Sequence, residues 1–209
     1  MVTFRKRRLS LALVGSIFLL AIGTAARAHD GRLLHVSVGG VVRAPMGWSG
    51  FCTEYPDQCQ GTSSQPREIV ISQTAWRDLL KINRWVNRAI MPMTDMEHWG
   101  TIEKWSLPTD GYGDCEDYAL LKRKMLIDAG WPREALLMTV VRDKDGEGHA
   151  VLTVITDKGD FVLDNKNETV LPWAETGYRF VKRQSQNDPN VWVMLDDGHP
   201  AVTVTSKGN

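Results

Sequence analysis

Residues 113–119 read Gly-Asp-Cys-Glu-Asp-Tyr-Ala, and this stretch is the most informative one for both fold and chemistry. Asp114 is a favourable N-cap residue and apolar residues recur at helical spacing after it, so a helix is predicted from Cys115 to about Gly130. A cysteine in the first turn meets the positive end of the helix dipole, which stabilises the nucleophilic thiolate. From position alone, a reactive thiol and an inert core cysteine are equally open readings.

A nucleophilic thiol needs a base, and the region after this helix offers a candidate. Segments rich in Val, Ile, Leu and Thr, separated by glycine-containing turns, predict strands at 150–155 and 161–163. His149 opens the first strand and Asp164 follows the second. In an antiparallel hairpin the start of one strand lies beside the end of the next, so Asp164 is expected to orient the His149 imidazole. A lone histidine is more often structural, but three agreeing placements favour a triad with Cys115 as nucleophile.

The rest of the chain predicts an α+β protein. Ser72 caps a helix that runs to about Ile90, in which Trp76 and Trp85 are expected to lie in the core. Helices come first and strands follow, which is the α+β order with an antiparallel sheet. The expected strands are 136–141, 150–155, 161–163, 180–183 and 191–195, with 201–205 as a further candidate.

Residues 93–113 are expected to form a loop between the two helices. His98 in this loop is a second histidine that could act as a base. No carboxylate partner is evident for it, so it is a weaker candidate than His149.

Residues 1–28 have the form of a secretory signal peptide. A basic cluster at Arg5 to Arg8 precedes an apolar run, and Ala26-Arg27-Ala28 supplies the small-x-small cleavage pattern. The alternative is an uncleaved anchor, but a run of about 14 residues is short for a span of about 20. Cleavage after Ala28 and export as a soluble periplasmic protein are therefore expected.

Residues 29–68 are expected to form an irregular extension before a domain at 69–209. Cys52 and Cys59 lie in this extension with six residues between them, in a segment rich in Gly and Pro. Exported proteins form disulfides, so a Cys52–Cys59 bond is predicted, with two free thiols as the alternative. Cys115 is the third cysteine and stays unpaired.

The formal charge of the whole chain is zero, but the charge is unevenly distributed. Residues 1–28 hold five of the 25 basic residues and none of the 25 acidic ones, so residues 29–209 carry −5. This balance gives no basic footprint for nucleic acid, so nucleic acid is not expected as a partner.

Three blocks in order carry a family resemblance: Gly113-Asp-Cys-Glu-Asp-Tyr-Ala, Gly148-His-Ala-Val-Leu and Val162-Leu-Asp-Asn. Together they resemble the bacterial transglutaminase-like cysteine proteinases, a family that includes LapG-like periplasmic proteases, and the chain looks like a divergent branch of it. The resemblance implies a papain-like, transglutaminase-type fold. It assigns Cys115 as nucleophile, His149 as general base and Asp164 as orienting residue.

The resemblance also implies calcium binding by Asp114, Glu116 and Asp117. Three carboxylates beside a thiol raise its pKa, and a bound divalent cation would cancel their field. All-oxygen ligands suit calcium rather than zinc. The alternative is that these acids only cap the helix, a role that Asp and Glu fill well.

The predicted function is an exported, calcium-dependent cysteine endopeptidase that acts on a periplasmic or cell-surface protein. The resemblance implies a surface adhesin as the substrate and an inner-membrane receptor as the regulator. A transglutaminase or amidase with the same triad remains an alternative, because the acyl acceptor depends on the shape of the cleft. A catalytically inactive, calcium-dependent binding module is the alternative from a different class.

Overall fold

The computed structural model describes Met1, residues 34–61 and residues 65–198. The predicted signal peptide, apart from Met1, and the candidate strand at 201–205 lie outside the described residues. Within the described part of the chain, no helix has both the length and the apolar character needed to cross a bilayer.

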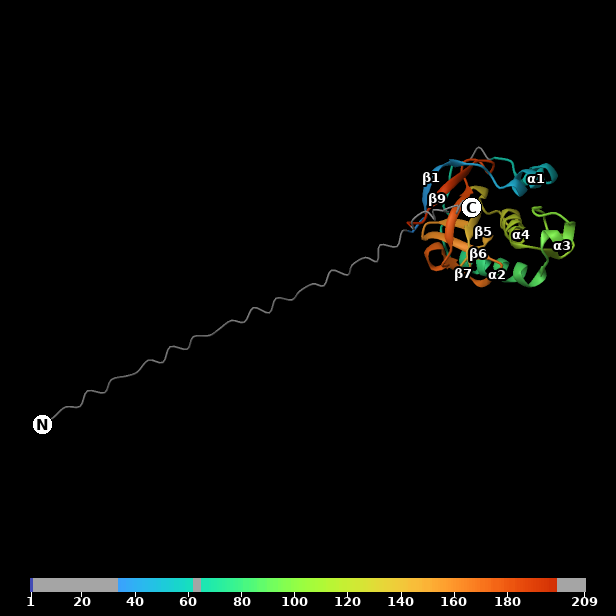
Figure 1. Ribbon diagram of the computed structural model, residues 1–209. Helices are drawn as coiled ribbons and strands as arrows, with labels where there is room; N and C mark the ends of the chain where they lie inside the picture. The colour runs from blue at the N-terminus through green and yellow to red at the C-terminus, as the bar shows by residue number, and fades with distance from the viewer. Residues whose placement is uncertain (2–33, 62–64, 199–209) are drawn as a thin grey trace, which may run out of the picture. The chain divides into compact units, whose positions relative to one another are not determined.

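The centre of the fold is a seven-stranded antiparallel sheet with the order β1-β9-β8-β4-β5-β6-β7 (Figure 1). The order follows largely from hairpins, since β4 to β7 are consecutive neighbours. The strands are β1 (Ser37–Val42), β4 (Leu136–Arg142), β5 (Gly148–Thr156), β6 (Gly159–Asp164), β7 (Asn167–Pro172), β8 (Arg179–Gln184) and β9 (Trp192–Asp196).

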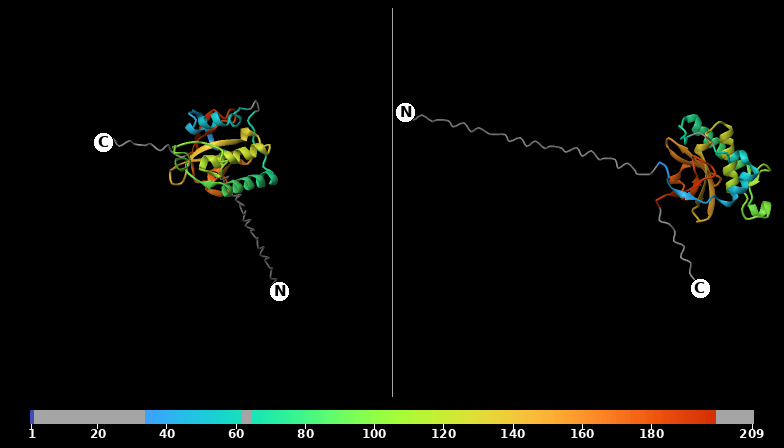
Figure 2. Two further views of the ribbon diagram at one scale, coloured as in Figure 1. Left: turned by 90° about the vertical axis from the view of Figure 1, so that its right-hand side faces the viewer. Right: turned by 90° about the horizontal axis from the view of Figure 1, so that it is seen from above.

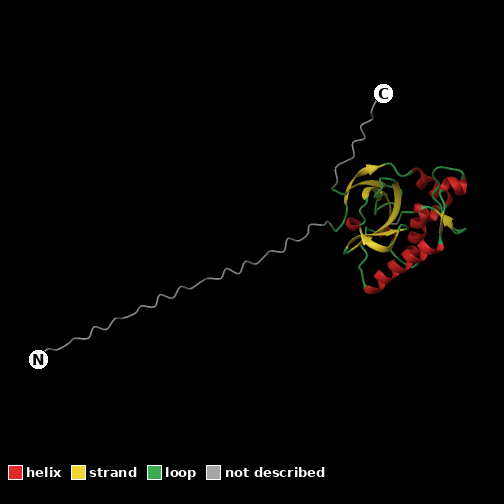
Figure 3. Cartoon of the chain, turned by 60° about the horizontal axis from the view of Figure 1, so that its bottom comes forward, coloured by secondary structure: helices red, strands yellow, loops and turns green. Residues whose placement is uncertain are grey.

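In the described residues four α-helices accompany the sheet, together with the two-stranded parallel pair β2 (Met91–Pro92) and β3 (Tyr112–Gly113). The helices are α1 (Met46–Glu54), α2 (Gln73–Ala89), α3 (Asp95–Trp99) and α4 (Cys115–Asp128). Helix α4 packs on β5 and α2 packs on β7, and the two helices contact each other (Figure 2). Figure 3 shows the helices gathered on one side of the curved sheet. The predicted α+β class is confirmed.

The main core lies between these helices and the sheet. Leu120 and Leu126 of α4 pack against Met138 of β4 and Leu152 of β5, and Trp48 of α1 joins the same cluster. Full burial of each such side chain stabilises the fold by about 1.5–3 kcal/mol. This packing holds the N-terminus of α4 rigidly against the first residues of β5, where the candidate catalytic residues lie.

The expectation of an irregular segment at 29–68 is wrong for its described part. β1 pairs with β9, and α1 buries Trp48 and Phe51 in the main core. The predicted disulfide between Cys52 and Cys59 is present in the structure. The sequence gives little sign of α1, because its nine residues lack a clear amphipathic pattern and its burial depends on partners far along the chain.

Three further features differ from expectation. The expected loop at 93–113 contains α3, which begins with a capping box between Thr94 and Glu97. β7 begins with the polar residues Asn-Glu-Thr, so the apolar pattern of a strand is absent at its start. Trp85 was expected in the core but is 52% exposed on the outer side of α2.

Candidate active site

Cys115 is the first residue of α4, directly after the N-cap Asp114, and its side chain is partly buried. Its thiol donates a hydrogen bond to Glu116 Oε2 at 3.0 Å. The backbone N–H of Ala150 in turn donates to Cys115 Sγ at 3.4 Å, and this contact joins the start of α4 to the start of β5. The residue before Ala150 is His149, so the thiol lies beside the predicted base.

His149 and Asp164 lie together as the hairpin pattern predicted. His149 Nε2 is 2.9 Å from Asp164 Oδ1, and the two side chains are only 1% and 5% exposed. Asp164 Oδ1 also accepts the backbone N–H of Lys166 at 3.0 Å. The strands β5 and β6 thus hold the pair on a rigid hairpin, and the nitrogen that remains for the thiol is Nδ1.

Tyr178 contacts both members of this pair, and the sequence did not indicate it. Its hydroxyl donates to Asp164 Oδ2 at 2.5 Å, and its ring meets the His149 ring edge-on, with 5.6 Å between the ring centroids. Burial raises the pKa of Asp164, but the hydrogen bonds from His149 and Tyr178 outweigh it and hold that pKa below its usual value. Asp164 is therefore an ionised, fully bonded partner for the imidazole.

Two hollows meet at the thiol and the imidazole. Their volumes are about 390 and 430 Å³, and both are lined by Cys115, Gly148 and His149. Met46 and Ile102 add apolar surface to the first hollow. Thiol and imidazole therefore face the same accessible space, with room for a bound chain on either side. A larger hollow of about 660 Å³ lies elsewhere, on α2, and no cysteine or histidine lines it.

The three acids of the predicted metal site divide into two groups around Asp114. Ligand atoms of Asp114, Cys115 and Glu116 lie within 4.8 Å of one another, and so do those of Asp95, Asp114 and Asp117. Asp114 Oδ1 is buried and has no hydrogen-bond partner among the described residues. Asp117 is better satisfied, because its Oδ1 accepts the backbone N–H of Ser106 at 2.8 Å.

This cluster is electrostatically uncompensated in the absence of a cation. Burial and the charge of Asp114 raise the pKa of Glu116 to about 9 and that of Asp117 to about 7. Burial and the charge of Glu116 raise the pKa of the Cys115 thiol well above its ordinary value. The acids therefore oppose the helix dipole, as the sequence predicted, and hold the thiol in its protonated form.

Asp95 joins the acidic cluster although the sequence gave no reason to include it. It lies 19 residues before Asp114, and its backbone N–H donates to Asp114 Oδ2 at 3.3 Å. Its own carboxylate accepts the backbone N–H of Lys104. No pattern connects α3 with the start of α4, so only the folded chain brings these two carboxylates together.

The expectation that His98 has no carboxylate partner is wrong, because His98 Nε2 lies 2.8 Å from Asp110 Oδ2. His98 also stacks on Trp99, with 3.9 Å between the ring centroids. His98 is nevertheless not among the residues that line the two hollows at Cys115. Position relative to the thiol, rather than the presence of a carboxylate partner, separates the two histidines.

The sequence pattern of the bacterial transglutaminase-like cysteine proteinases (BTLCP) matches residues 38–200. Among solved structures, calcium-bound LapG of Legionella pneumophila is similar, with a TM-score of 0.50 and 23% identity over 62% of this chain and 74% of that one. A second LapG structure from that organism has 26% identity and a TM-score of 0.47, over 56% of this chain and 67% of that one. No curated protein matches the chain.

Proposed function

The chain belongs to the bacterial transglutaminase-like cysteine proteinases and is a cysteine peptidase, and from this premise we propose that Cys115, His149 and Asp164 are its catalytic triad. The observation that carries the proposal is the buried 2.9 Å contact between His149 and Asp164, beside a thiol that lines the same hollows. A nucleophile, a base and a group that orients the base are the three parts that covalent acyl transfer needs.

In the proposed reaction, His149 Nδ1 takes the thiol proton and Cys115 Sγ attacks the carbonyl carbon of a peptide bond. The oxyanion that forms is stabilised by the backbone N–H of Cys115, because the first N–H groups of a helix have no partner within it. The C–N bond then breaks, and the imidazolium gives its proton to the leaving amine. Water, deprotonated by His149, hydrolyses the thioester and restores the thiol.

We propose calcium as the cation of this site, held by Asp114, Glu116 and Asp117. The donor set fits, because ligand atoms of Asp114 lie within 4.8 Å of those of Glu116 in one group and of those of Asp117 in the other. One Asp114 oxygen is buried without a hydrogen-bond partner among the described residues, and oxygen ligands suit calcium. The similar LapG structure is described as calcium-bound, which supports calcium as the cation. Bound calcium would supply a fixed positive charge that offsets the carboxylates beside Cys115.

The proposed setting is the periplasm, reached through the predicted signal peptide. The proposed substrate is a periplasmic or cell-surface protein, such as an adhesin, and the proposed regulator is an inner-membrane receptor. Both partners rest on the family resemblance. The cleft at Cys115 supports a protein substrate in general, because it extends to both sides of the thiol and offers room for an extended chain.

The test compares new protein N-termini on the cell surface and in the medium of cells with the wild-type chain and with Cys115→Ala. Termini that appear only with the wild type, and with calcium present, identify the substrate and support the proposal. An added labelled amine detects transamidation, because a transglutaminase would attach it to substrate side chains in place of cleavage. Identical termini in both strains, together with a Cys115 that resists thiol probes, would favour an inactive binding module.

A further inference from the structure

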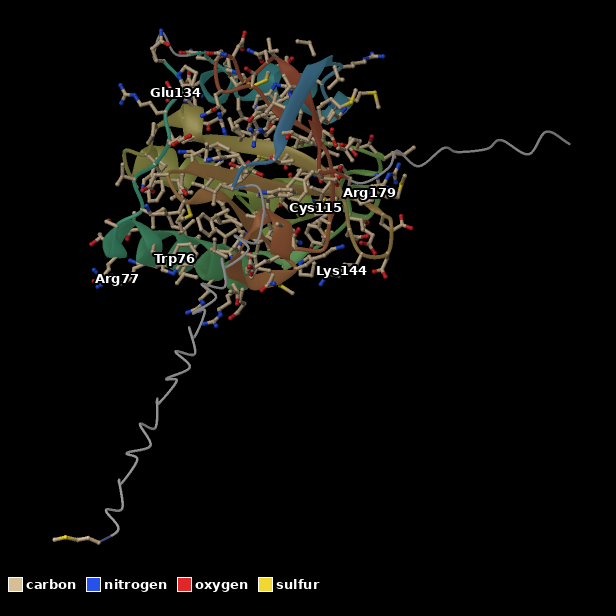
Figure 4. All side chains as sticks on the ribbon, turned by 90° about the vertical axis from the view of Figure 1, so that its left-hand side faces the viewer. Trp76, Arg77, Cys115, Glu134, Lys144 and Arg179 are labelled. Carbon is tan, nitrogen blue, oxygen red and sulfur yellow. A yellow bond between two sulfur atoms is a disulfide. The ribbon has the colours of Figure 1, made fainter. Side chains whose placement is uncertain are left out.

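The outer side of α2 carries a row of cations. Arg77, Lys81, Arg84 and Arg88 follow one another at intervals of four, three and four residues, which places them on one face of a helix. They line the open hollow of about 660 Å³, together with Trp85, Leu80 and Ala89. Figure 4 labels Arg77 at the outer edge of the molecule, beside Trp76, whose ring instead packs against Phe161 of the sheet.

Most of this positive charge is not neutralised within the protein. Arg88 forms an ion pair with Glu168 at 3.0 Å. Within the described part of the chain, Arg77 donates to the Thr74 hydroxyl and to the Gln73 backbone carbonyl. Among the described residues, Arg77, Lys81 and Arg84 form no ion pair, although the charge of Arg84 helps Arg88 to lower the pKa of Glu168. Since residues 29–209 carry −5 in total, this face has the opposite sign to the exported chain as a whole.

Trp85 lies in the middle of this row. Its neighbours at helical spacing are Lys81 and Arg88, one turn before and one turn after, and Arg84 precedes it directly. The side chain is 52% exposed. An exposed Trp among Lys and Arg is the combination found at membrane–water interfaces, where the indole enters the headgroup region and the cations meet the phosphates.

A lipid surface fits this face better than an acidic protein does. Protein interfaces have an apolar centre from which charges are depleted. Here cations surround a single aromatic ring, and the remaining apolar surface is limited to Leu80 and Ala89. Long, unpaired basic side chains in a row suit a diffuse field of phosphate groups, to which each Lys or Arg adds its own attraction.

We propose that the outer face of α2 binds the surface of an anionic phospholipid bilayer, with Arg77, Lys81 and Arg84 on the phosphates and Trp85 in the headgroup layer. None of the residues that line this face lines the hollows at Cys115. The protein can therefore lie on a membrane while its cleft stays open to a protein substrate. The proposal is independent of the assignment of the triad.

The test measures co-sedimentation of the chain, purified from its export compartment, with vesicles of phosphatidylglycerol and phosphatidylcholine and with vesicles of phosphatidylcholine alone. The expected result is binding to the anionic vesicles only, and weaker binding as salt is raised from about 50 to about 200 mM. The variant Arg77→Gln/Lys81→Gln/Arg84→Gln should bind about a hundredfold more weakly, at about fivefold per cation lost. Glutamine preserves helix propensity, so α2 should remain folded, which circular dichroism checks.

The matched control removes three cations elsewhere, as Arg67→Gln/Lys144→Gln/Lys158→Gln, and should bind as the wild type does. Trp85→Ala should weaken binding several-fold while the salt dependence stays the same. Equal binding to both kinds of vesicle, equal loss in both triple variants, or no binding at low salt would overturn the proposal. Binding to polyglutamate but not to anionic vesicles would also overturn it, in favour of an acidic protein partner.

Discussion

His149–Asp164 and His98–Asp110 are two histidine–aspartate pairs with nearly the same geometry. Their N–O distances are 2.9 and 2.8 Å, and each histidine has a tyrosine ring edge-on to it. The first pair is almost fully buried, whereas the side chains of His98 and Asp110 are 11% and 49% exposed. Only the first histidine lines the hollows at the free thiol.

The comparison shows that a histidine–carboxylate pair is not by itself a catalytic site. Asp164 is held by a tyrosine hydroxyl and a backbone N–H in addition to His149, so the imidazole has one fixed orientation. Asp110 also accepts a backbone N–H, from Tyr112 at 3.2 Å, but it is 49% exposed, so water competes for its oxygens and screens its attraction to His98. Three features together distinguish His149–Asp164: burial, a firmly held carboxylate and a neighbouring thiol. Matched substitutions in His98–Asp110 serve as controls for tests of these features.

The largest contrast is expected from removing each histidine. His149→Ala should reduce peptidase activity to the background of uncatalysed hydrolysis, because the thiol loses its base. His98→Ala should change the rate less than twofold, since His98 does not line the cleft. The measurement is the rate of substrate cleavage by both variants, with circular dichroism as a check of folding. Comparable losses in the two variants would show that the site has been assigned to the wrong pair.

The next contrast concerns the carboxylates. Asp164→Asn should lower kcat by about 10³–10⁴-fold, because an amide fixes the wrong tautomer of the imidazole. Asp110→Asn is the matched control and should leave kcat unchanged. Steady-state kinetics of both variants, with KM and kcat separated, gives the answer. A small effect of Asp164→Asn would mean that the orienting charge contributes little.

Calcium should change the reactivity of the Cys115 thiol and leave the His149–Asp164 pair unaffected. Chelation should slow cleavage by about tenfold or more, since a rise of one pKa unit in the thiol costs a factor of ten in thiolate. Calcium should restore the rate better than magnesium, which requires stricter octahedral geometry. Glu116→Gln should weaken this recovery, because one of the proposed calcium ligands loses its charge. In chelator the variant should alkylate faster than the wild type only above about pH 9, where Glu116 would otherwise be ionised beside the thiol.

If the acids only cap α4, the result should be different. Chelation would then leave both activity and thiol alkylation unchanged, and Glu116→Gln would cost at most about 1 kcal/mol of stability. Calorimetric titration of calcium into the chelator-treated protein separates the two accounts directly.

The smallest effect is expected from the tyrosines. Tyr178→Phe removes one hydrogen bond to Asp164, which should lower kcat a few-fold and cost about 1 kcal/mol of stability. The pKa of Asp164 should rise towards its usual value, so the acid limb of the pH–rate profile should move to higher pH. Tyr112→Phe, next to His98, should leave the profile unchanged. An unaltered acid limb in Tyr178→Phe would reduce Tyr178 to a packing residue.

The same two pairs show how far sequence reasoning reaches. His149 and Asp164 could be predicted because they belong to consecutive strands, and hairpin geometry places the start of one strand beside the end of the next. The N-cap at Asp114 and the disulfide between Cys52 and Cys59 were also predictable, from the preference of Asp for N-cap positions and from the short spacing of the two cysteines. Each of these features follows from a recognisable local rule, whereas short separation along the chain is not sufficient, because Tyr178 lies only 14 residues from Asp164.

The features that were missed depend on contacts made only in the folded chain. Asp95 meets Asp114, and Tyr178 meets Asp164, across segments whose relative positions no local pattern sets. The segment that contains α1 is held by residues far along the chain, since Arg123 donates to Gln58 O and Asn190 donates to Cys59 O. Trp85 was misplaced because a tryptophan in an amphipathic helix normally faces the core.

The central claim is that His149, and not His98, activates Cys115. Cys115 is the only cysteine outside the disulfide, so alkylation with iodoacetamide reports on it alone. The measurement is the alkylation rate as a function of pH, in calcium, for the wild type, His149→Ala and His98→Ala.

The wild type and His98→Ala should react at a pH well below the ordinary thiol pKa of about 8.5, because an imidazolium next to the thiol stabilises the thiolate. His149→Ala should lose this reactivity and titrate at higher pH. Three superimposable curves, or a curve shifted only in His98→Ala, would contradict the account.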